Sequence, residues 1–254
     1  MRVFTRNLAQ ARATFGAEYE IVAGDVEDVR SLQTAMQGCF GIHINLDGHG
    51  DFDLERRGVE NIARAAKQTQ VERITYLSGA SVVAENTWFA GTRAKLQAET
   101  ALRESGVPYT IFKATFFMES LPRYVQGKRA SVIGKQPSPW HWVAANDYAR
   151  MVSKAYATPA AANKEFYIYG PDAYTMRQAL EKYCALAQPG VAVGDLPLWM
   201  AGLIARTSGA KELRAQLPFF EYTGRIRETG DCREANQILG APTTTLEQWA
   251  QLQM

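Results

Sequence analysis

The chain has 254 residues, and its 28 lysines and arginines against 26 aspartates and glutamates give a formal net charge of +2. Hydrophobic residues make up 46% and charged residues 21%, as in ordinary globular proteins. A chain of this size can bury the core of one α/β domain with an appendage. The nearly balanced charge gives no reason to expect nucleic acid or an anionic membrane as a partner. Three cysteines and three histidines, all dispersed, predict neither a disulfide framework nor a metal site.

We expect a cytoplasmic protein without a targeting segment. The chain starts at Met1 and continues directly into residues 2–5, which are typical of a strand, and Arg6 and Asn7 then interrupt any apolar signal region. The most apolar later stretch, residues 196–205, is about half as long as a membrane-spanning helix must be.

Short β-rich runs alternate with helical periods through the first half of the chain. Strands are predicted at residues 3–5, 20–23, 41–45, 73–77 and 109–112. Asp28 is a good N-cap for one of the intervening helices, and Val59, Ile62, Ala63 and Ala66 share one face of a longer helix. Strand and helix alternating at intervals of roughly 20–30 residues indicate βαβ units and a parallel sheet, that is, a Rossmann-like doubly wound α/β fold.

After about residue 120 the pattern loosens into a smaller, mainly helical lobe. Thr175 and Gln178 have the spacing of a capping box, and Thr244 and Glu247, in Thr244-Thr245-Leu246-Glu247, have the same spacing. Residues 196–217 are predicted to be helical with an interruption near Ser208-Gly209. We therefore divide the chain into a dinucleotide-binding core, residues 1–120, and a substrate lobe, residues 121–254, from which some strands and helices return to the core.

Parallel sheets place ligands at the carboxyl ends of their strands. The residues that fall there are Arg6, Asp25, Asn45, Ser78 and Thr115. An arginine at the end of the first strand favours a ribose 2′-phosphate, and the alternative is an exposed arginine at a helix start. Asp25 can bond an adenine amino group while Val26 packs on the ring, or it can serve a turn. The sequence gives Asp25 no obvious structural task.

For several further residues, we favour a structural role over a catalytic one. Ser78 and Ser81 could polarise a substrate carbonyl or simply solvate a strand end. His43 is expected to be a core or tautomer-fixed histidine, and His49, in Gly48-His49-Gly50, is a minor catalytic candidate. Trp140-His141-Trp142 is expected to pack between the lobes.

Six segments together resemble the NmrA-like family of atypical short-chain dehydrogenase/reductases. They are RVFTRN, VAGDVED, LSGAS, SGVPYTIFKATFFMES, WVAANDYARMV and LGAPTTTLEQW, in this order along nearly the whole chain. The resemblance implies a Rossmann core that binds NADP or NAD. Carried over by position, Arg6 would take the 2′-phosphate, Asp25 and Val26 the adenine, and Thr115, Phe116 and Phe117 the nicotinamide. From their places at strand ends, Asn7, Asn45 and Ser78 are further cofactor-binding candidates.

Lys95 resembles the lysine that contacts the nicotinamide ribose in short-chain dehydrogenases, and it is our one catalytic candidate. Their proton-donating tyrosine would lie four residues earlier, where this chain has Gly91. The alternative for Lys95 is a solvated pair with Glu99. Lys113-Ala114 also departs from the family's usual Arg-Pro.

The family opens with a strand, a Gly-rich phosphate loop and a helix, and all three are missing before Arg2. Their loss removes the amides that hold the pyrophosphate and leaves a gap between the strand at Val3 and the strand at Ile42. The chain could be the tail of a longer protein, a short form whose sheet closes differently, or a decayed relative. We favour the first, and an upstream DNA sequence without an in-frame Gly-rich segment would refute it.

We therefore expect an NADP-linked (or NAD-linked) oxidoreductase of a small carbonyl or quinone-type substrate, with weak or absent cofactor binding in this chain. The alternatives are a dinucleotide-sensing regulator that acts on a protein partner, or an interaction protein that no longer binds cofactor.

Overall fold

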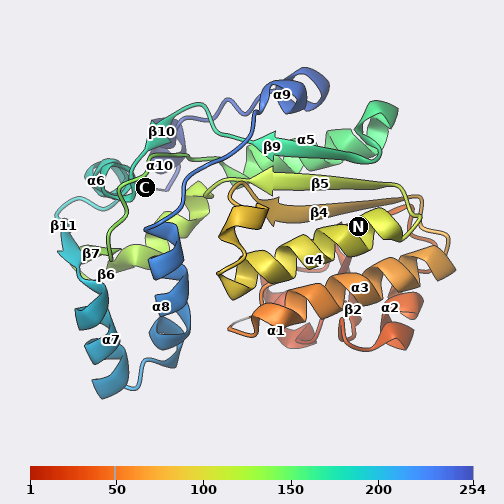
Figure 1. Cartoon of the computed structure of the whole chain (residues 1–254), viewed down its shortest axis with the longest axis horizontal. Coiled ribbons are helices and arrows are strands. Elements are labelled where there is room, and N and C mark those ends of the chain that lie inside the picture. Colours follow the sequence, from red (N-terminus) through yellow and green to blue (C-terminus); the bar gives the residue numbers. More distant parts are fainter. Residues whose placement is uncertain (49, 254) are drawn as a thin grey trace.

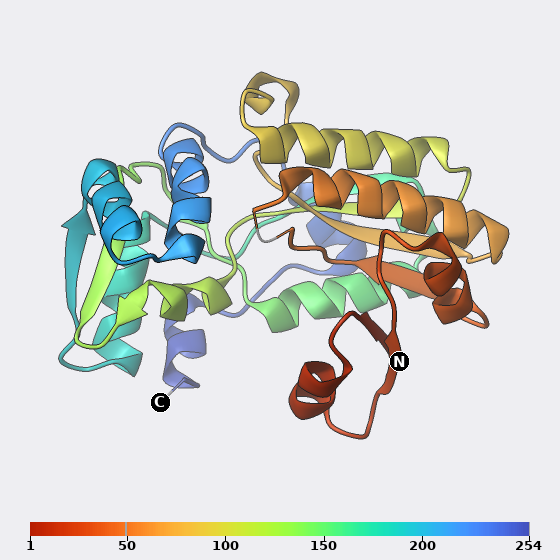
Figure 2. The ribbon, with the colours of Figure 1, turned by 90° about the horizontal axis from the view of Figure 1, so that it is seen from below.

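The alternating pattern of the first half folds into parallel strands with helices on both faces, as predicted. The computed structural model describes residues 1–48 and 50–253 (Figure 1). The strands are β1 (Arg2–Thr5), β2 (Glu20–Ala23), β3 (Gly41–Ile44), β4 (Arg73–Gly79), β5 (Tyr109–Ala114) and β9 (Lys164–Ile168). Helices α3 (Phe52–Gln68) and α4 (Ala90–Glu104) cover one face, and α5 (Ala145–Ala157) lies on the other (Figure 2).

The core strands form two separate parallel sheets. One has the order β1-β2 and the other the order β3-β4-β5-β9. Among the described residues, β1 pairs only with β2, and β3 pairs only with β4. The expected gap between Val3 and Ile42 is therefore present, and the sheet does not close by direct pairing of β1 with β3.

Local sequence signals account for most of the core helices. Asp28 caps α2 (Val29–Met36) by accepting a bond from the Arg30 amide, as predicted. The predicted apolar face of α3 is buried at all four positions, because a helix with one apolar stripe gains most by laying that stripe on the sheet. Asn7 caps α1 (Leu8–Phe15) and accepts a bond from the Gln10 amide.

The lobe contains more strand than its sequence suggested. A three-stranded sheet is formed by β6 (Val125–Gln126), β7 (Arg129–Ile133) and β11 (Ala192–Leu196), and β8 (Trp140–His141) pairs with β10 (Ala173–Tyr174). The prediction missed β11 because its short sequence, AVGDL, lacks the alternation of a half-buried strand. The remaining elements are α6 (Met176–Ala187), α7 (Leu198–Thr207), α8 (Lys211–Thr223), α9 (Arg233–Leu239), α10 (Leu246–Gln251) and the 3₁₀ turns Ala84–Asn86, Met118–Tyr124 and Pro159–Ala161.

The two predicted capping boxes have different outcomes. The box of Thr175 and Gln178 is confirmed at the start of α6. The second box is displaced by one residue, because Thr245 and Gln248 cap α10 in place of Thr244 and Glu247. The amides of Thr243 and Thr244 instead donate to the buried carboxylate of Asp147, which fixes the register of this segment.

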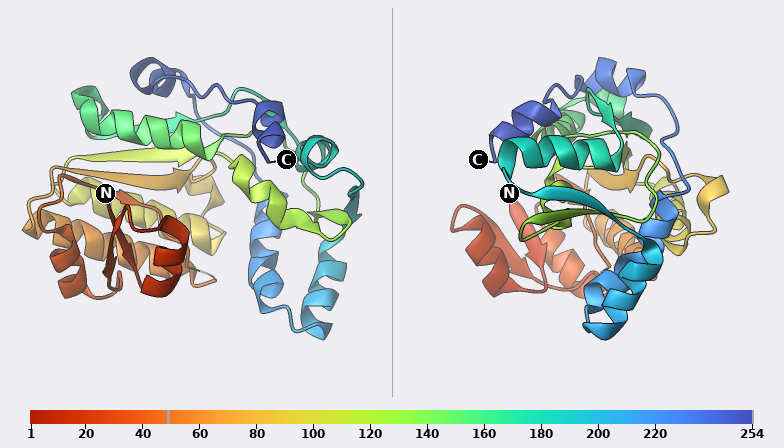
Figure 3. Two further views of the ribbon diagram at one scale, coloured as in Figure 1. Left: turned by 180° about the vertical axis from the view of Figure 1, so that it is seen from behind. Right: turned by 90° about the vertical axis from the view of Figure 1, so that its left-hand side faces the viewer.

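The lobe lies beside the carboxyl ends of the core strands (Figure 3). The predicted interruption at Ser208-Gly209 separates α7 from α8, and Gly209 has a φ of +69°, a conformation that glycine adopts without steric cost. Within the described ranges, no helix combines the length and apolarity needed to cross a membrane. The same residues contain no grouping of His, Cys, Asp and Glu suited to a metal ion.

Candidate functional site

A cavity of about 290 Å³ lies where the ends of β3 and β4 meet the starts of α3 and α4 and the lobe helix α8. Its polar lining includes Asp51, Glu55, Ser81, Thr92, Lys95 and Tyr222, and its aromatic lining includes Phe52, Phe89 and Phe219. A larger and shallower groove between α3 and α4, of about 480 Å³, is lined by residues of their outward faces such as Arg93 and Gln97. Concave, mainly apolar sites with a few convergent polar groups are typical of ligand pockets.

Lys95 is the cationic side chain of this cavity. Its ammonium pairs with the carboxylate of Glu55 and donates to the Leu77 carbonyl over 3.4 Å. Glu55 also accepts a bond of 2.8 Å from the Tyr76 hydroxyl. Burial, and then the charge of Glu55, raise the pKa of Tyr76 well above its usual value. An ammonium has three donors, so Lys95 keeps one for a ligand.

The predicted alternative, a solvated pair of Lys95 with Glu99, is not present. Glu99 is fully buried and accepts bonds from Ser78 (2.6 Å) and Lys113 (3.1 Å). Buried charges persist only when they are paired and hydrogen-bonded, and Arg103 completes the set around Glu99 at 3.0 Å. Ser78 therefore has its hydroxyl turned to a network that ties α4 to the sheet, so its role toward a cofactor stays a prediction.

Arg6, Asn7 and Asn45 lie exposed at the ends of β1 and β3. Their positions agree with the strand-end pattern, but none lines the cavity. The Asn7 side chain already caps α1. The cofactor contacts predicted for these three residues therefore remain predictions, and Arg6 is the charged member of the three.

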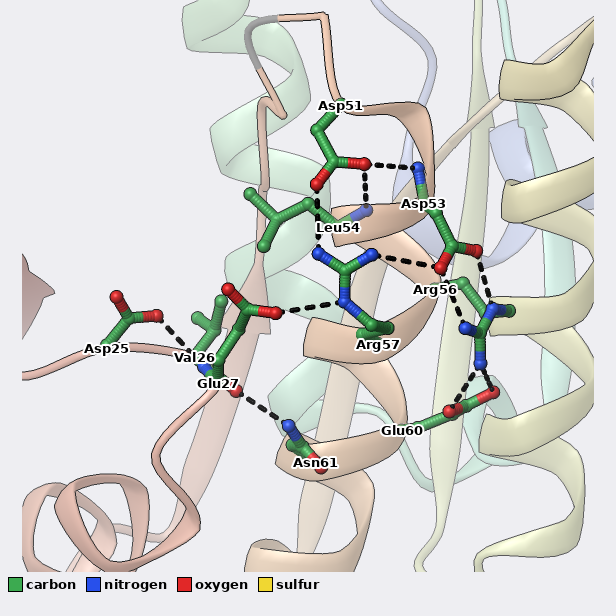
Figure 4. Close-up of polar contacts among 10 residues, drawn as sticks. All are labelled: Asp25, Val26, Glu27, Asp51, Asp53, Leu54, Arg56, Arg57, Glu60 and Asn61. Atoms are coloured by element: carbon green, nitrogen blue, oxygen red, sulfur yellow. Dashed lines mark hydrogen bonds and ion pairs between the residues drawn. The ribbon is translucent and has the colours of Figure 1, made fainter.

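The expectation that Asp25 lacks a structural task is wrong. One of its carboxylate oxygens accepts a bond of 2.9 Å from the Glu27 amide (Figure 4). The turn is then fixed to α3, because Asn61 donates to the Val26 carbonyl over 3.1 Å. Val26 packs beside Gly58 of α3. A local carboxylate–amide bond of this kind stabilises a turn, and the adenine contact of Asp25 stays a prediction.

Arg57 joins the same turn to the start of α3 (Figure 4). It bonds Glu27, Asp51 and Asp53, each over 2.9 Å. Arg56 and Arg57 together lower the pKa of Asp53. Asp51 also accepts bonds from the amides of Asp53 and Leu54. The amides that could bind a phosphate at this helix start are therefore engaged by a carboxylate of the chain itself.

Thr115, Phe116 and Phe117 lie in the wall between the core and the lobe. The Thr115 hydroxyl donates to Glu228 over 2.5 Å. Phe116 stacks on Trp142 with ring centroids 5.5 Å apart, and Phe117 packs edge-on against Tyr148. None of the three lines the cavity, although Phe116 contacts the cavity residue Phe219. Their predicted contacts to a nicotinamide remain predictions.

The surroundings of His43, Trp140 and Trp142 test three further expectations. His43 has Nδ1 2.9 Å from the Thr75 hydroxyl, which can donate or accept, so this contact leaves the predicted fixed tautomer a prediction. The residue is exposed on β3 rather than in the core. Trp140 and Trp142 are buried, and Trp140 packs in one cluster with Phe89 of the core and Tyr222 of the lobe, as the predicted packing between the lobes requires. His49 lies outside the described residues.

Most residues of this cavity escaped the sequence analysis, and Glu55 and Tyr222 are the two that matter most for its polar contacts. Glu55 is forty positions before Lys95, and no local pattern connects them. Tyr222 reaches the cavity from the lobe, and its neighbours Phe219 and Phe220 give this segment the appearance of ordinary core. Both are set by tertiary contacts, which a spacing rule does not detect.

The described residues fit the two ends of a dinucleotide better than its middle. Lys95 and the aromatic cavity suit a nicotinamide riboside, and exposed Arg6 suits a 2′-phosphate. Among the described glycines, none forms a loop directly after a core strand with amides free to cradle a pyrophosphate. Gly48 follows β3 and lines the cavity, and a Cβ there would lie 2.0 Å from the Asp51 carbonyl oxygen, so only glycine fits at this position.

One protein family matches this chain in a comparison with known proteins. The profile of a family described as NAD(P)H-binding matches residues 1–157. The chain is 25% identical over 166 residues to a (4-alkanoyl-5-oxo-2,5-dihydrofuran-3-yl)methyl phosphate reductase of Streptomyces griseus, covering 64% of this chain and 57% of that protein. It is 24% identical over 175 residues to an NAD(P)H azoreductase of Xenophilus azovorans, covering 68% and 60%. The chain thus matches less than two thirds of the length of these relatives.

Solved structures share the fold over almost the whole chain. A nucleoside-diphosphate-sugar epimerase of Staphylococcus aureus has a TM-score of 0.77 at 19% identity, covering 98% of this chain and 90% of that one. The triphenylmethane reductase of Citrobacter sp., complexed with NADP(H), has a TM-score of 0.77 at 16% identity, covering 100% and 90%. The NADPH-dependent quinone oxidoreductase of Escherichia coli, complexed with NADPH, has a TM-score of 0.71 at 20% identity, covering 98% and 88%. These likenesses establish the Rossmann-like fold.

Proposed function

The chain belongs to the NAD(P)H-binding family, and on this premise we propose that it is an NADP-linked oxidoreductase of a small carbonyl or quinone-type substrate. One observation carries the proposal: Lys95 lies in a cavity at the strand ends, with its ammonium oriented by Glu55 and one donor left for a ligand. The names of the relatives point the same way, since both curated relatives are reductases of small molecules.

When bound, NAD(P)H supplies the hydride. Lys95 then bonds the nicotinamide ribose, and Glu55 holds the ammonium in place. Arg6 bonds the 2′-phosphate, while Asp25 and Val26 take the adenine. Each of these contacts is a proposal that rests on where the strand ends place the side chain.

The aromatic lining of the cavity favours a flat, conjugated substrate. Phe52 and Phe89 pack edge-to-face with ring centroids 5.0 Å apart, and Phe219 closes the lobe side. Aromatic faces of this kind stack on planar rings and exclude water. A quinone satisfies both features, because it combines a flat ring with carbonyl oxygens that polar groups of the cavity can bond.

A dinucleotide-sensing regulator is the second candidate, and Gly91 is the observation that favours it. A Cβ at this position would lie 2.6 Å from the Phe89 ring. The chain therefore lacks the tyrosine of a Tyr-Lys pair, and position 91 has no room for its side chain. A chain without that pair could bind cofactor without turnover.

The test is NADPH oxidation measured with a panel of quinones and small carbonyl compounds, at NADPH concentrations up to the millimolar range. Oxidation that depends on the acceptor and falls in Lys95→Met supports the oxidoreductase. Binding of NADPH without oxidation by any acceptor supports the sensor. Absence of both supports an interaction protein without cofactor.

A further inference from the structure

Tyr222 brings a hydroxyl group from the lobe into the wall of the core cavity. Tyr222 is only 4% exposed, and its ring stacks on that of Phe89 with ring centroids 4.3 Å apart and an interplanar angle of 21°. The hydroxyl contacts Ser81 and Thr92, which are 141 and 130 positions away in the chain. A buried tyrosine hydroxyl normally finds a partner, and this one finds both of its partners across the boundary between lobe and core.

The hydrogen bonds around Tyr222 have a definite direction. Thr92 donates to the Tyr222 hydroxyl over 2.8 Å. Tyr222 has a single proton and donates it to Ser81, whose Oγ is 3.0 Å away and whose carbonyl oxygen is 3.2 Å away. A serine hydroxyl that accepts such a bond still has its own proton to donate. Ser81 is half-buried and lines the cavity, so this proton is available to a ligand there.

The position of this pair complements that of Lys95. Ser81 follows β4, Lys95 extends from α4, and both line the same cavity. Gly91 lies beside Thr92 at the point where short-chain dehydrogenases would carry their tyrosine. The Tyr222 hydroxyl contacts Thr92, so the lobe brings a phenol to this wall of the cavity, which the local sequence does not supply.

Resting on the function proposed above, we propose that Ser81 donates a hydrogen bond to the carbonyl oxygen of a quinone-type substrate and that Tyr222 is the residue that positions the Ser81 hydroxyl. Ser81 touches the substrate in this arrangement, whereas Tyr222 acts through Ser81. The substrate subsite is then complete only when the lobe is docked, because α8 supplies both Tyr222 and the aromatic ring of Phe219.

The pair is tested by binding of 1,4-naphthoquinone-2-sulfonate, followed by quenching of tryptophan fluorescence. Trp88 is a suitable reporter, because its ring centroid is 5.5 Å from that of Tyr222. We expect Ser81→Ala and Tyr222→Phe each to weaken the affinity for the probe by roughly three- to tenfold, the loss of one hydrogen bond. The double variant should bind no more weakly than Ser81→Ala, because both changes act through one hydroxyl.

Tyr124→Phe is the matched control. Tyr124 is a half-buried tyrosine of the same lobe that packs against Phe220, and it does not line the cavity, so its variant should bind the probe like the wild type. Unchanged binding in Ser81→Ala would overturn the inference, and so would fully additive losses in the double variant. Tyr222→Phe keeps the stacked ring, and if it nevertheless unfolds, a comparison of Ser81→Ala with Ser81→Thr decides, since threonine restores the hydroxyl and should restore the affinity.

Turnover separates this inference from the proposed function. With quinone as acceptor, Tyr222→Phe should lower kcat more than it raises KM, because it misplaces the bond without emptying the cavity. Hydroxyl-dependent probe binding in a wild-type protein that oxidises no NADPH supports the subsite and overturns the proposed function. Quinone-dependent oxidation that Ser81→Ala and Tyr222→Phe leave unchanged supports the function and overturns the subsite.

Discussion

The ammonium of Lys95 and the carboxylate of Glu55 form an ion pair between α4 and α3, with Lys95 27% and Glu55 12% exposed at the side chain. The pair is partly shielded from water, so salt screens the attraction between its two charges less than in an exposed surface pair. Tyr76 donates to the same carboxylate. Glu55 therefore fixes where Lys95 presents its remaining donor, and this is the most specific feature of the cavity.

Glu55→Gln should lower the affinity for NADPH by roughly three- to tenfold, because a neutral amide holds the ammonium less firmly. The dissociation constant is measured by fluorescence titration. Glu60→Gln is the control, since Glu60 lies on the same helix and pairs with Arg56 at its surface. An equal loss of NADPH affinity in both variants would show that the effect follows from the net charge of the protein and not from the pair of Glu55 with Lys95.

Arg6→Ala should lower the preference for NADP over NAD, because an exposed arginine at the end of β1 recognises the 2′-phosphate that NAD lacks. Competition between the two cofactors for the protein measures this preference. Arg12→Ala, which removes a neighbouring exposed charge on α1, should leave it unchanged. Equal losses of affinity for NADP and NAD in Arg6→Ala would refute the role.

The β1-β2 sheet should be the least protected part of the core in hydrogen exchange. A two-stranded sheet is only marginally stable. Outside this sheet, Arg2 of β1 donates to the carbonyls of Ala35 and Gln37, and Phe4 packs against the core. Mass spectrometry of exchanged peptides should therefore show faster exchange in residues 1–23 than in β4 and β5. Equal protection would mean that the open edge of β1 is covered in solution.

Asp147→Asn should reduce the free energy of unfolding by about 1–3 kcal/mol. Burial alone would raise the pKa of Asp147, but the amides of Thr244 and Thr243 and the charge of Arg150 outweigh it, and the pKa is lowered from 3.8. A lowered carboxyl pKa stabilises the fold above the unfolded value and loses this effect as the pH falls toward the folded value.

Urea unfolding at several pH values measures this effect. The difference between the wild type and Asp147→Asn should be full near pH 6 and should shrink as the pH falls through 3.8 and below. A difference that does not change with pH would place the contribution of Asp147 in packing rather than in its charge.

The sequence predicted the elements that depend on local pattern. The βαβ order, the buried face of α3 and the caps at Asp28 and Thr175 all follow from periodicity and capping chemistry, and all are observed. The family was also identified correctly from the order of its motifs. These predictions are correct because each feature depends on residues that are close together in the sequence.

The features that the sequence did not predict depend on long-range contacts. The displaced cap of α10 follows from the reach of Asp147, about a hundred positions away. Asp25 acquires its structural bond, and Lys95 exchanges the expected partner Glu99 for Glu55, because of how α3 and α4 pack on the sheet. Rules based on residue spacing do not cover contacts between residues so far apart in the chain. These features of the site are therefore set by the tertiary structure alone.

The central claim is that the nicotinamide end of the cofactor binds beside Lys95 while the pyrophosphate is held by few groups of this chain. Fluorescence titration of the wild type and of Lys95→Met with NADPH tests it most directly. We predict a wild-type dissociation constant weaker than about 100 µM, equivalent to less than about 5.5 kcal/mol of binding free energy, and a further loss of roughly fivefold or more in Lys95→Met. A micromolar constant that Lys95→Met leaves unchanged would contradict the account.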